Sequence, residues 1–432
     1  HIDTGSRALF EDSVFRNNVV IGSGGAVSVT GGSVTNFTRV AFVSNRAAAS
    51  AATTEYANHS PNGGAAHISG YGSRAVFDEC NLGGNRARVG SGGAVSIEAQ
   101  ATVILFRANV FNDNICYSTG GSLQAAGGST VVCRGQSTFL NSNAISGGGV
   151  AAIGGSVLDF ESCLLKNNFG YQGGSVFLSE GSSADIVGCV INGSGATDGA
   201  GIFVSGESTR VSMRNVSVRF NVATRQGGGA MAQSLAKIVL ESGSHIARNS
   251  APVGAGVDIS DGAELVVHGS TSGIHYNSND KVVNGDSRWW EEPETEEEEG
   301  LASGGISCRG HGSMVTVTNG ATVTHNDPFN IWCDTDCTMV GLPSVVCGTR
   351  YVFEATSADI SGRCPVADQT AAGGSFNITG KLGSIPNGTR ARVEAWIGQS
   401  HVTGAALYFP QDVGFRPVVI VPCVAGAGAE VP

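Results

Sequence analysis

The chain has 432 residues, with 64 glycines, 11 prolines and a formal net charge of −11. Because β-branched residues are plentiful, the glycines fit the tight turns of a folded core better than disorder, and the length allows two domains. Seven glutamates lie between Glu291 and Glu299, so the rest of the chain is nearly neutral, and no basic stripe suggests nucleic acid. The longest apolar stretch, 417–427, contains two prolines and is too short to span a bilayer.

Two series of residues recur in step along residues 1–326. Small-residue blocks such as GGAV begin at Gly24, Gly63, Gly92, Gly120, Gly147, Gly173, Gly199, Gly228, Gly254 and Ser303. Asparagines follow the same rhythm at Asn18, Asn45, Asn85, Asn114, Asn143, Asn168, Asn221, Asn249, Asn277 and Asn326, with Ser194 in the one repeat that lacks asparagine. A repeat of this kind indicates a solenoid in which one repeat forms one coil.

Residues 92–114 show what one coil contains. Three short apolar runs, AVSI, TVILF and NVF, are separated by corners with glycine, Ala-Gln or asparagine, and helical periodicity is absent. Three strands and three corners are the unit of a parallel β-helix, in which each strand pairs with its counterpart about 4.8 Å away. The pattern therefore predicts an all-β chain with about 11 coils over residues 1–326 and a narrow core of aliphatic stacks.

The asparagine series predicts a ladder at one corner. Stacked asparagines can hydrogen-bond to the asparagines above and below and to the local backbone. The alternative is that asparagine only tolerates the turn conformation there. Either way, we interpret the series as structural and not catalytic.

The cysteines suggest disulfides. Cys163 and Cys189 each precede the ladder position of their coil by five residues, so they should stack in neighbouring coils within disulfide range. Cys80 holds the same register without a cysteine neighbour, which makes it the candidate for the odd thiol among 11. Further disulfide candidates cluster toward the C-terminus, at Cys333, Cys337, Cys347, Cys364 and Cys423. The alternative is a set of reduced core thiols in a cytosolic protein.

Six Asn-x-Ser/Thr sequons also point to the extracellular side. They lie at Asn36, Asn58, Asn192, Asn215, Asn377 and Asn387. We expect an extracellular glycoprotein of the cell surface or matrix, with N-linked glycans and no other cofactor.

The pattern changes after the last repeat. Residues 327–345 are predicted to form a cap or junction, which would cover the open strand edge of the last coil. Residues 346–432 show alternating strands such as SFNITGKL, RARVEAWIG and RPVVIVPCV. They predict a small β domain, either sandwich-like or an extension of the β-helix.

The repeat resembles that of polymorphic outer-membrane proteins of chlamydial surfaces. GGAV-type blocks alternate with Phe-x-x-Asn copies that end at Asn18, Asn45 and Asn114, and with degenerate copies that end at Asn168 and Asn249. The resemblance covers roughly residues 1–330 and implies a right-handed parallel β-helix of the pectin-lyase-like class, with an adhesive role. The cysteines and sequons depart from that family, so we interpret the chain as an extracellular relative in repeat only, of eukaryotic, algal type.

An enzyme of the same fold class is the alternative function. Polysaccharide hydrolases need two facing carboxylates, and lyases need a calcium-holding acidic set and a base. Acidic residues are sparse in the coils (among them Asp159, Asp185, Asp258, Asp261 and Glu264) and form no Asp-Asp pair with a basic motif. The tripeptide around His311 matches the GHG of polygalacturonases but lacks the accompanying acidic motifs. We therefore expect no catalytic or metal site.

Two long insertions suggest where partners bind. They run from Asn45 to Gly63 and from Asn277 to Ser303, so both should leave the solenoid at one corner. They carry Tyr56, Trp289, Trp290 and the glutamate run. These aromatics are the predicted contacts with other proteins, copies of the same chain or glycans, whereas a solvated loop is the alternative for the glutamates.

Overall fold

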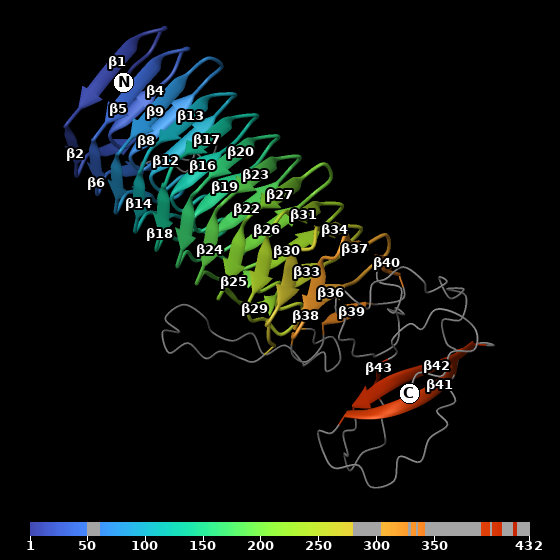
Figure 1. Ribbon diagram of the computed structural model, residues 1–432. Coiled ribbons are helices and arrows are strands. Elements are labelled where there is room, and N and C mark those ends of the chain that lie inside the picture. The colour runs from blue at the N-terminus through green and yellow to red at the C-terminus, as the bar shows by residue number, and fades with distance from the viewer. Residues whose placement is uncertain are drawn as a thin grey trace.

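The computed structural model describes residues 1–49, 61–279, 304–326, 330–333, 336–341, 390–397, 400–407 and 418–420. All regular structure in these ranges is β, and no helix occurs there. Figure 1 shows the strands of residues 7–340 stacked coil upon coil along one axis. The predicted all-β solenoid of about 11 parallel coils is therefore confirmed.

Each complete coil contributes one strand to each of three parallel sheets, and the described parts of the two end coils contribute two strands each. Sheet A contains β4 (Val27–Val29), β8 (Ala66–Ser69), β12 (Val95–Glu98), β16 (Leu123–Ala125), β19 (Val150–Ala152), β22 (Val176–Ser179), β26 (Ile202–Ser205), β30 (Ala230–Gln233), β33 (Val257–Ile259), β36 (Ile306–Cys308) and β39 (Ile331–Cys333). Sheet B contains β1 (Arg7–Glu11), β5 (Val34–Thr38), β9 (Arg74–Asp78), β13 (Thr102–Phe106), β17 (Thr130–Arg134), β20 (Val157–Glu161), β23 (Ser183–Val187), β27 (Arg210–Arg214), β31 (Lys237–Glu241), β34 (Glu264–His268), β37 (Met314–Thr318) and β40 (Thr338–Val340). Sheet C contains β2 (Val14–Arg16), β6 (Ala41–Val43), β10 (Asn81–Gly83), β14 (Val110–Asn112), β18 (Thr138–Leu140), β21 (Leu164–Lys166), β24 (Val190–Asn192), β28 (Ser217–Arg219), β32 (His245–Ala247), β35 (Gly273–His275) and β38 (Thr322–Thr324).

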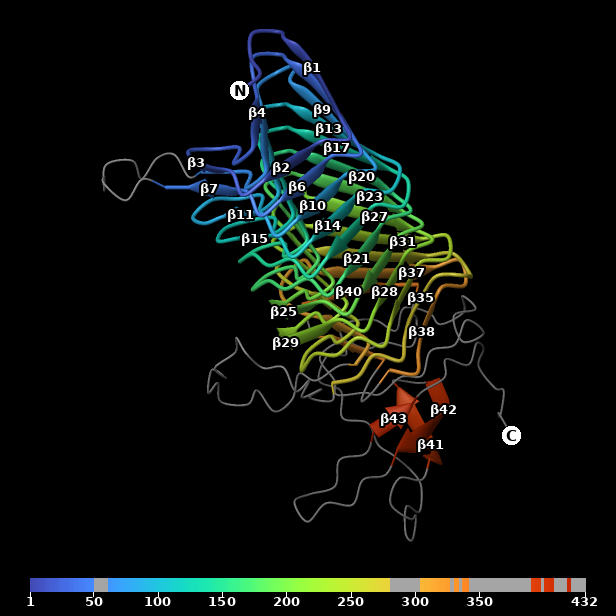
Figure 2. The ribbon, with the colours of Figure 1, turned by 90° about the vertical axis from the view of Figure 1, so that its left-hand side faces the viewer.

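A fourth group of short strands forms a ridge along the solenoid, which we call the flange. The flange consists of the segments between sheet C and the following glycine block, such as residues 115–119 and 169–172. Its strands are β3 (Val19–Ile21), β7 (Arg46–Ala48), β11 (Arg86–Ala87), β15 (Ile115–Cys116), β25 (Gly195–Asp198) and β29 (Val222–Gln226). In Figure 2, β3, β7, β11 and β15 project to one side of the three main sheets.

The core consists of columns of equivalent inward side chains. Parallel in-register pairing places such residues one coil apart, close to the distance at which rings stack. In the N-terminal half, sheets B and C each contain an aromatic column: Phe37 stacks on Phe77 with ring centroids 5.0 Å apart, and Phe111 stacks on Phe139 at 4.7 Å. Aliphatic columns of the expected kind run through the first coils, for example Val29, Ile68 and Ile97 on sheet A, and also through the later ones, as at Leu240 and Val267. The predicted aliphatic stacks are therefore present, and the phenylalanine columns of the first coils add to them.

Beyond Asn326, two strands add to the solenoid. β39 pairs in parallel with β36, and β40 pairs in parallel with β37. Further along, β41 (Arg390–Ile397), β42 (Ser400–Leu407) and β43 (Val418–Ile420) form an antiparallel sheet. The strand expected at SFNITGKL lies outside the described residues.

Candidate functional site

The corner between sheet C and the flange is built on the asparagine ladder. The backbone N–H and the side-chain Nδ2 of Asn45 both donate to Oδ1 of Asn85, at 3.0 and 3.1 Å. Nδ2 of Asn45 also donates to the carbonyl oxygen of Phe15 at 2.9 Å. The same double donation joins Asn18 to Asn45, Asn221 to Asn249 and Asn277 to Asn326. From Asn45 onward the rungs are buried, so the ladder satisfies corner backbone groups that water cannot reach.

One predicted rung is wrong. The ladder position between Asn114 and Asn168 is occupied by Ser142, whose N–H donates to Oδ1 of Asn168 at 3.0 Å. Asn143 lies one residue later and pairs with Ile115 in the flange. The register is set by the left-handed corner residue that precedes each rung, here Asn141 with φ of 51°. Because asparagines stand on both sides of Ser142, at 141 and 143, the sequence pattern could not show that the serine between them is the rung.

The predicted Cys163–Cys189 disulfide is also wrong. The two residues do occupy one column, but Sγ of Cys189 accepts the backbone N–H of Cys163 at 3.2 Å. It therefore fills the role that Ser244 Oγ has toward the N–H of Val216 in a later coil. In this structure the sulfur of Cys80, the predicted odd thiol, is buried and carries no disulfide bond, and the same is true of Cys163 and Cys189.

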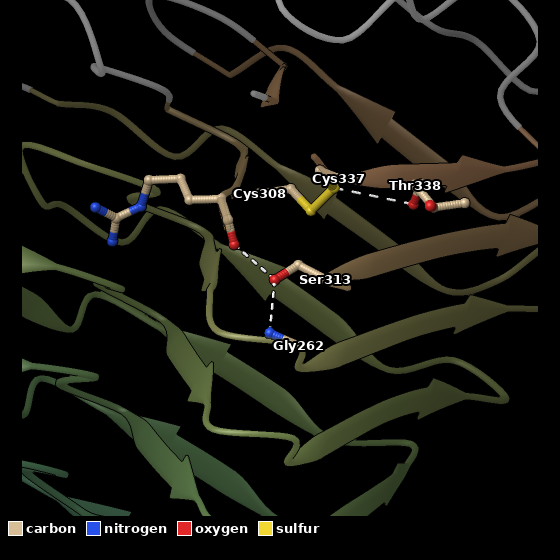
Figure 3. The surroundings of a disulfide bond; sticks show 6 residues. Gly262, Cys308, Ser313, Cys337 and Thr338 are labelled. Atoms are coloured by element: carbon tan, nitrogen blue, oxygen red, sulfur yellow. Dashed lines mark hydrogen bonds between the residues drawn. A yellow bond between two sulfur atoms is a disulfide. The ribbon is translucent and has the colours of Figure 1, made fainter. Parts of the chain in front are cut away.

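A disulfide joins Cys308 at the end of β36 to Cys337 just before β40 (Figure 3). Cys337 is one of the disulfide candidates predicted from the sequence, whereas its partner Cys308 is not among them. Cys333 is disulfide-bonded as well. Cys347, Cys364 and Cys423 lie outside the described residues.

The three sequons within the described residues lie on the other sheets. Asn36 is exposed on β5, Asn192 is half-buried at the end of β24, and Asn215 is exposed at the corner between sheets B and C. None of the three lies in the flange. Asn58, Asn377 and Asn387 are outside the described residues, as are Tyr56, Trp289 and Trp290.

Small residues hold the flange against the glycine blocks. Buried alanines and a cysteine line its inner side, among them Ala87, Cys116 and Ala144. A Cβ at Gly93 would overlap the carbonyl oxygen of Gly121 and lie 2.7 Å from the backbone nitrogen of Ile115. The second glycine of a block is therefore needed where the flange backbone reaches sheet A.

The outer side of the flange is apolar and exposed. We call the exposed residues of four successive coils the flange stripe; they are Val89, Ile115, Tyr117, Ile145, Phe169 and Tyr171. Tyr117 is 66% exposed and Tyr171 49%. Arg86 and Arg88 are exposed beside them, and the described flange residues of the first six coils include no aspartate or glutamate. Aromatic and arginine side chains together are the composition found at protein interfaces.

Farther along the flange, ion pairs connect four coils. Oδ1 of Asp198 accepts a hydrogen bond from Nε of Arg225 at 2.8 Å. Arg309 donates to Oδ2 of Asp258 at 2.8 Å and to Oε1 of Gln226 at 2.6 Å. Burial raises the pKa of the fully buried Asp258, whereas Arg309 opposes that shift. Because Asp258 has no exposed surface, this cluster fastens the flange to sheet A.

The outer side of sheet C and the corner that follows it carry histidines and a tyrosine. The rings of His245 and His275 are 5.1 Å apart, and Tyr276 stacks on His325 at 5.1 Å. Burial lowers the pKa of His245 and of His275. Across the described ranges, no group of three or more histidines, cysteines and acidic residues is placed to hold a metal ion.

The GHG tripeptide belongs to a turn. Gly310 and Gly312 both have φ of 80°, which favours glycine, and His311 is exposed between β36 and β37. The glycines therefore have a conformational reason to be there.

No helix within the described ranges is long and apolar enough to cross a membrane. Comparisons with protein-family models, with curated proteins and with solved structures give no significant match to this chain.

Proposed function

We propose that this protein is a structural and adhesive module of an extracellular assembly, and that it associates through the flange stripe. The observation that supports this most is that four successive coils expose apolar side chains along one ridge of the solenoid. Contiguous exposed apolar residues mark contact sites on soluble proteins. The resemblance of the repeat to that of polymorphic outer-membrane proteins, which implies a right-handed β-helix and an adhesive role, agrees with this proposal.

The charges beside the stripe favour an acidic partner. Arg86 and Arg88 flank the stripe without any neighbouring acid in the described flange of those coils. The chain itself carries a net charge of −11. Because seven acids of that balance lie between Glu291 and Glu299, a second copy is the partner that the charges support, with its glutamate run as the acidic counterpart of these arginines.

The described sequons are compatible with this arrangement. Glycans on Asn36, Asn192 or Asn215 would leave from sheets B and C and from their shared corner. The flange stripe would remain uncovered by those three glycans. Glycosylation and an extracellular location are part of the proposal.

Sedimentation velocity of the glycosylated protein over a range of salt concentrations tests this function. We expect self-association that weakens with salt, because part of the attraction is between exposed charges. Two double variants, Tyr117→Ser combined with Tyr171→Ser and Arg86→Glu combined with Arg88→Glu, should each weaken association about tenfold or more. A tenfold loss corresponds to about 1.4 kcal/mol. Tyr71→Ser is the matched control, since Tyr71 is 84% exposed at a turn outside the flange.

Three outcomes contradict the proposal in different ways. Equal association of the flange and control variants would exclude the stripe as the contact. A protein that stays monomeric yet binds an immobilised acidic polysaccharide through Arg86 and Arg88 would make a glycan the partner. Measurable cleavage of such a polysaccharide would replace the structural role by the enzymatic alternative.

A further inference from the structure

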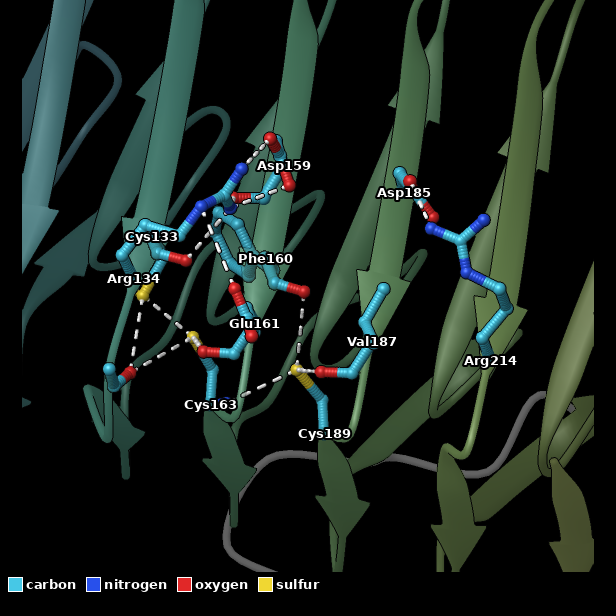
Figure 4. A network of polar contacts seen from close by, with 11 residues as sticks. Cys133, Arg134, Asp159, Phe160, Glu161, Cys163, Asp185, Val187, Cys189 and Arg214 are labelled. Carbon is cyan, nitrogen blue, oxygen red and sulfur yellow. Dashed lines mark hydrogen bonds and ion pairs between the residues drawn. The ribbon is translucent and has the colours of Figure 1, made fainter. Parts of the chain in front are cut away.

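Three buried thiols meet at the bend between sheets B and C. Cys133 lies on β17 in the column that holds Leu105 and Phe160, and its side chain is fully buried. Cys163 follows β20 in the next coil and belongs to the corner column that also holds Cys189. Figure 4 shows the sulfur atoms of Cys133 and Cys163 facing each other, whereas the sulfur of Cys189 faces the backbone of Cys163.

The distance between the first two sulfur atoms is unusual for separate thiols. Sγ of Cys133 lies 2.7 Å from Sγ of Cys163. Non-bonded heavy atoms prefer separations of about 3.5 to 4.0 Å, and sulfur is larger than carbon. A disulfide needs about 2.0 Å. The pair is therefore well inside packing distance and closer to bonding distance, so a small side-chain rotation would close the gap.

Both sulfurs also share one local environment. Each lies near the carbonyl oxygen of Gly135, at 3.9 Å for Cys133 and 4.0 Å for Cys163. Cys189 is held differently, because its sulfur accepts the N–H of Cys163. The other free thiol nearby in sequence, Cys116, lies in the flange, where burial raises its pKa to about 12.

We propose that Cys133 and Cys163 form a disulfide that bonds sheet B of one coil to the corner of the next, while Cys189 remains a thiol. The two S–H bonds break and one S–S bond forms, releasing two protons and two electrons. The electrons pass to the disulfide of an oxidising folding partner, either a protein or a small molecule, which is reduced to two thiols. Because both sulfurs are buried in the finished solenoid, we expect exchange while these coils are still forming.

Tryptic mapping without reduction tests the bond. For this test the protein is expressed through an oxidising secretory compartment and purified without reductant. It is then denatured in the presence of an alkylating agent and digested with trypsin. Cleavage after Arg107, Arg134 and Lys166 puts Cys133 in peptide 108–134 and Cys163 in peptide 135–166. We expect these two peptides to be linked, with Cys116 and Cys189 alkylated when the fragments are sequenced.

Two variants separate this bond from the alternatives. Cys133→Val matches the valines later in its own column and should leave Cys163 open to alkylation. Cys189→Ser matches the serines of the corner column and should keep the link. Alkylation of both Cys133 and Cys163 in the wild-type protein overturns the proposal, as does a Cys163–Cys189 link. Since mapping of the wild-type protein decides this alone, a variant that fails to fold does not affect the result.

Discussion

At the scale of single residues, backbone contact between coils determines where glycine is required. Gly93 lies in a block where the flange and the next coil both approach, so a side chain would meet backbone atoms that cannot move away. Gly155 also lies in the solenoid, but a Cβ there would have no neighbour within 4 Å. Glycine is therefore required at Gly93 because there is no space for a side chain, whereas at Gly155 it is favoured only by its left-handed backbone conformation.

We predict that Gly93→Ala destabilises the protein by about 3 kcal/mol or more, because overpacking against backbone is not relieved by side-chain rotation. Gly155→Ala should cost only about 1 to 2 kcal/mol, the strain of a left-handed residue with φ of 73°. Denaturant unfolding of both variants measures the difference. Equal costs at the two sites would contradict the packing explanation for the glycine pairs.

Each ladder residue is matched in size to the residue of the small-residue block that faces it, which we call the wall residue; Ser175 and Gly201 are examples. Where the rung is a serine, the wall also has serine: Ser175 Oγ lies 2.7 Å from Ser194 Oγ. Where the rung is an asparagine, the wall has a smaller residue, and a Cβ at Gly201 would lie 3.2 Å from Nδ2 of Asn221. The combined volume of rung and wall is thus conserved within the chain.

This match predicts a strong coupling between two substitutions. Ser194→Asn alone should cost about 1 to 3 kcal/mol, because the amide would collide with Ser175. Adding Ser175→Gly should recover most of that loss by recreating the asparagine–glycine pair of the next coil. A double-mutant cycle from denaturant unfolding should give a coupling of about 1 kcal/mol or more. Additive effects would show that the two positions are independent.

At the scale of strands, the outer face of sheet A carries a column of polar side chains in its early coils, which includes a histidine. His67 on β8 pairs with Ser96, which pairs in turn with Gln124, so imidazole and amide groups occupy equivalent positions. Ser96 Oγ is hydrogen-bonded to Gln124 at 2.9 Å and to Glu98 at 2.8 Å. Burial lowers the pKa of His67, although Glu98 acts in the opposite direction.

We predict that His67 makes the protein less stable in mild acid. Its contribution to the free energy of unfolding is present above the unfolded-state pKa of about 6.5 and declines as the pH falls toward the lower folded-state pKa. The cause is that the unfolded chain takes up the proton first. Thermal unfolding at about pH 7.5 and pH 5.5 should therefore show a smaller decrease for His67→Gln than for the wild-type protein. His311→Gln, at an exposed turn, is the control and should decrease as the wild-type does. An unchanged decrease in His67→Gln would contradict this assignment.

At the scale of the whole molecule, stability is shared between neighbouring coils. Each strand of the solenoid pairs only with its counterparts in adjacent coils. Such repeat proteins behave as one-dimensional arrays, in which a complete repeat can be removed without disturbing the pairing register of the others. Asn168 and Ser194 occupy equivalent ladder positions in neighbouring coils, 26 residues apart. A deletion that begins after the first and ends with the second therefore removes one complete coil.

We predict that deleting residues 169–194 leaves a folded solenoid that is shorter by about 4.8 Å. Gly195 would then take the place of Phe169, with which it pairs in the intact protein. Deleting only residues 169–181 should prevent native folding, because the remaining strands of that coil would fall out of register. Circular dichroism and small-angle scattering distinguish the two results. Equal folding of both deletions would contradict the coil as the structural unit.

The period, the three strands of a coil and the position of the core followed from the sequence, because parallel pairing places chemically similar residues at equal intervals. Three features depended on tertiary structure. The choice of Ser142 over Asn143 depends on which residue takes the left-handed corner. The close approach of Cys163 to Cys133 is between different columns, so no single-register argument could find it. The flange stripe emerged only when the corner segments of successive coils were placed side by side, since its residues share no motif and are united only by facing outward from one ridge.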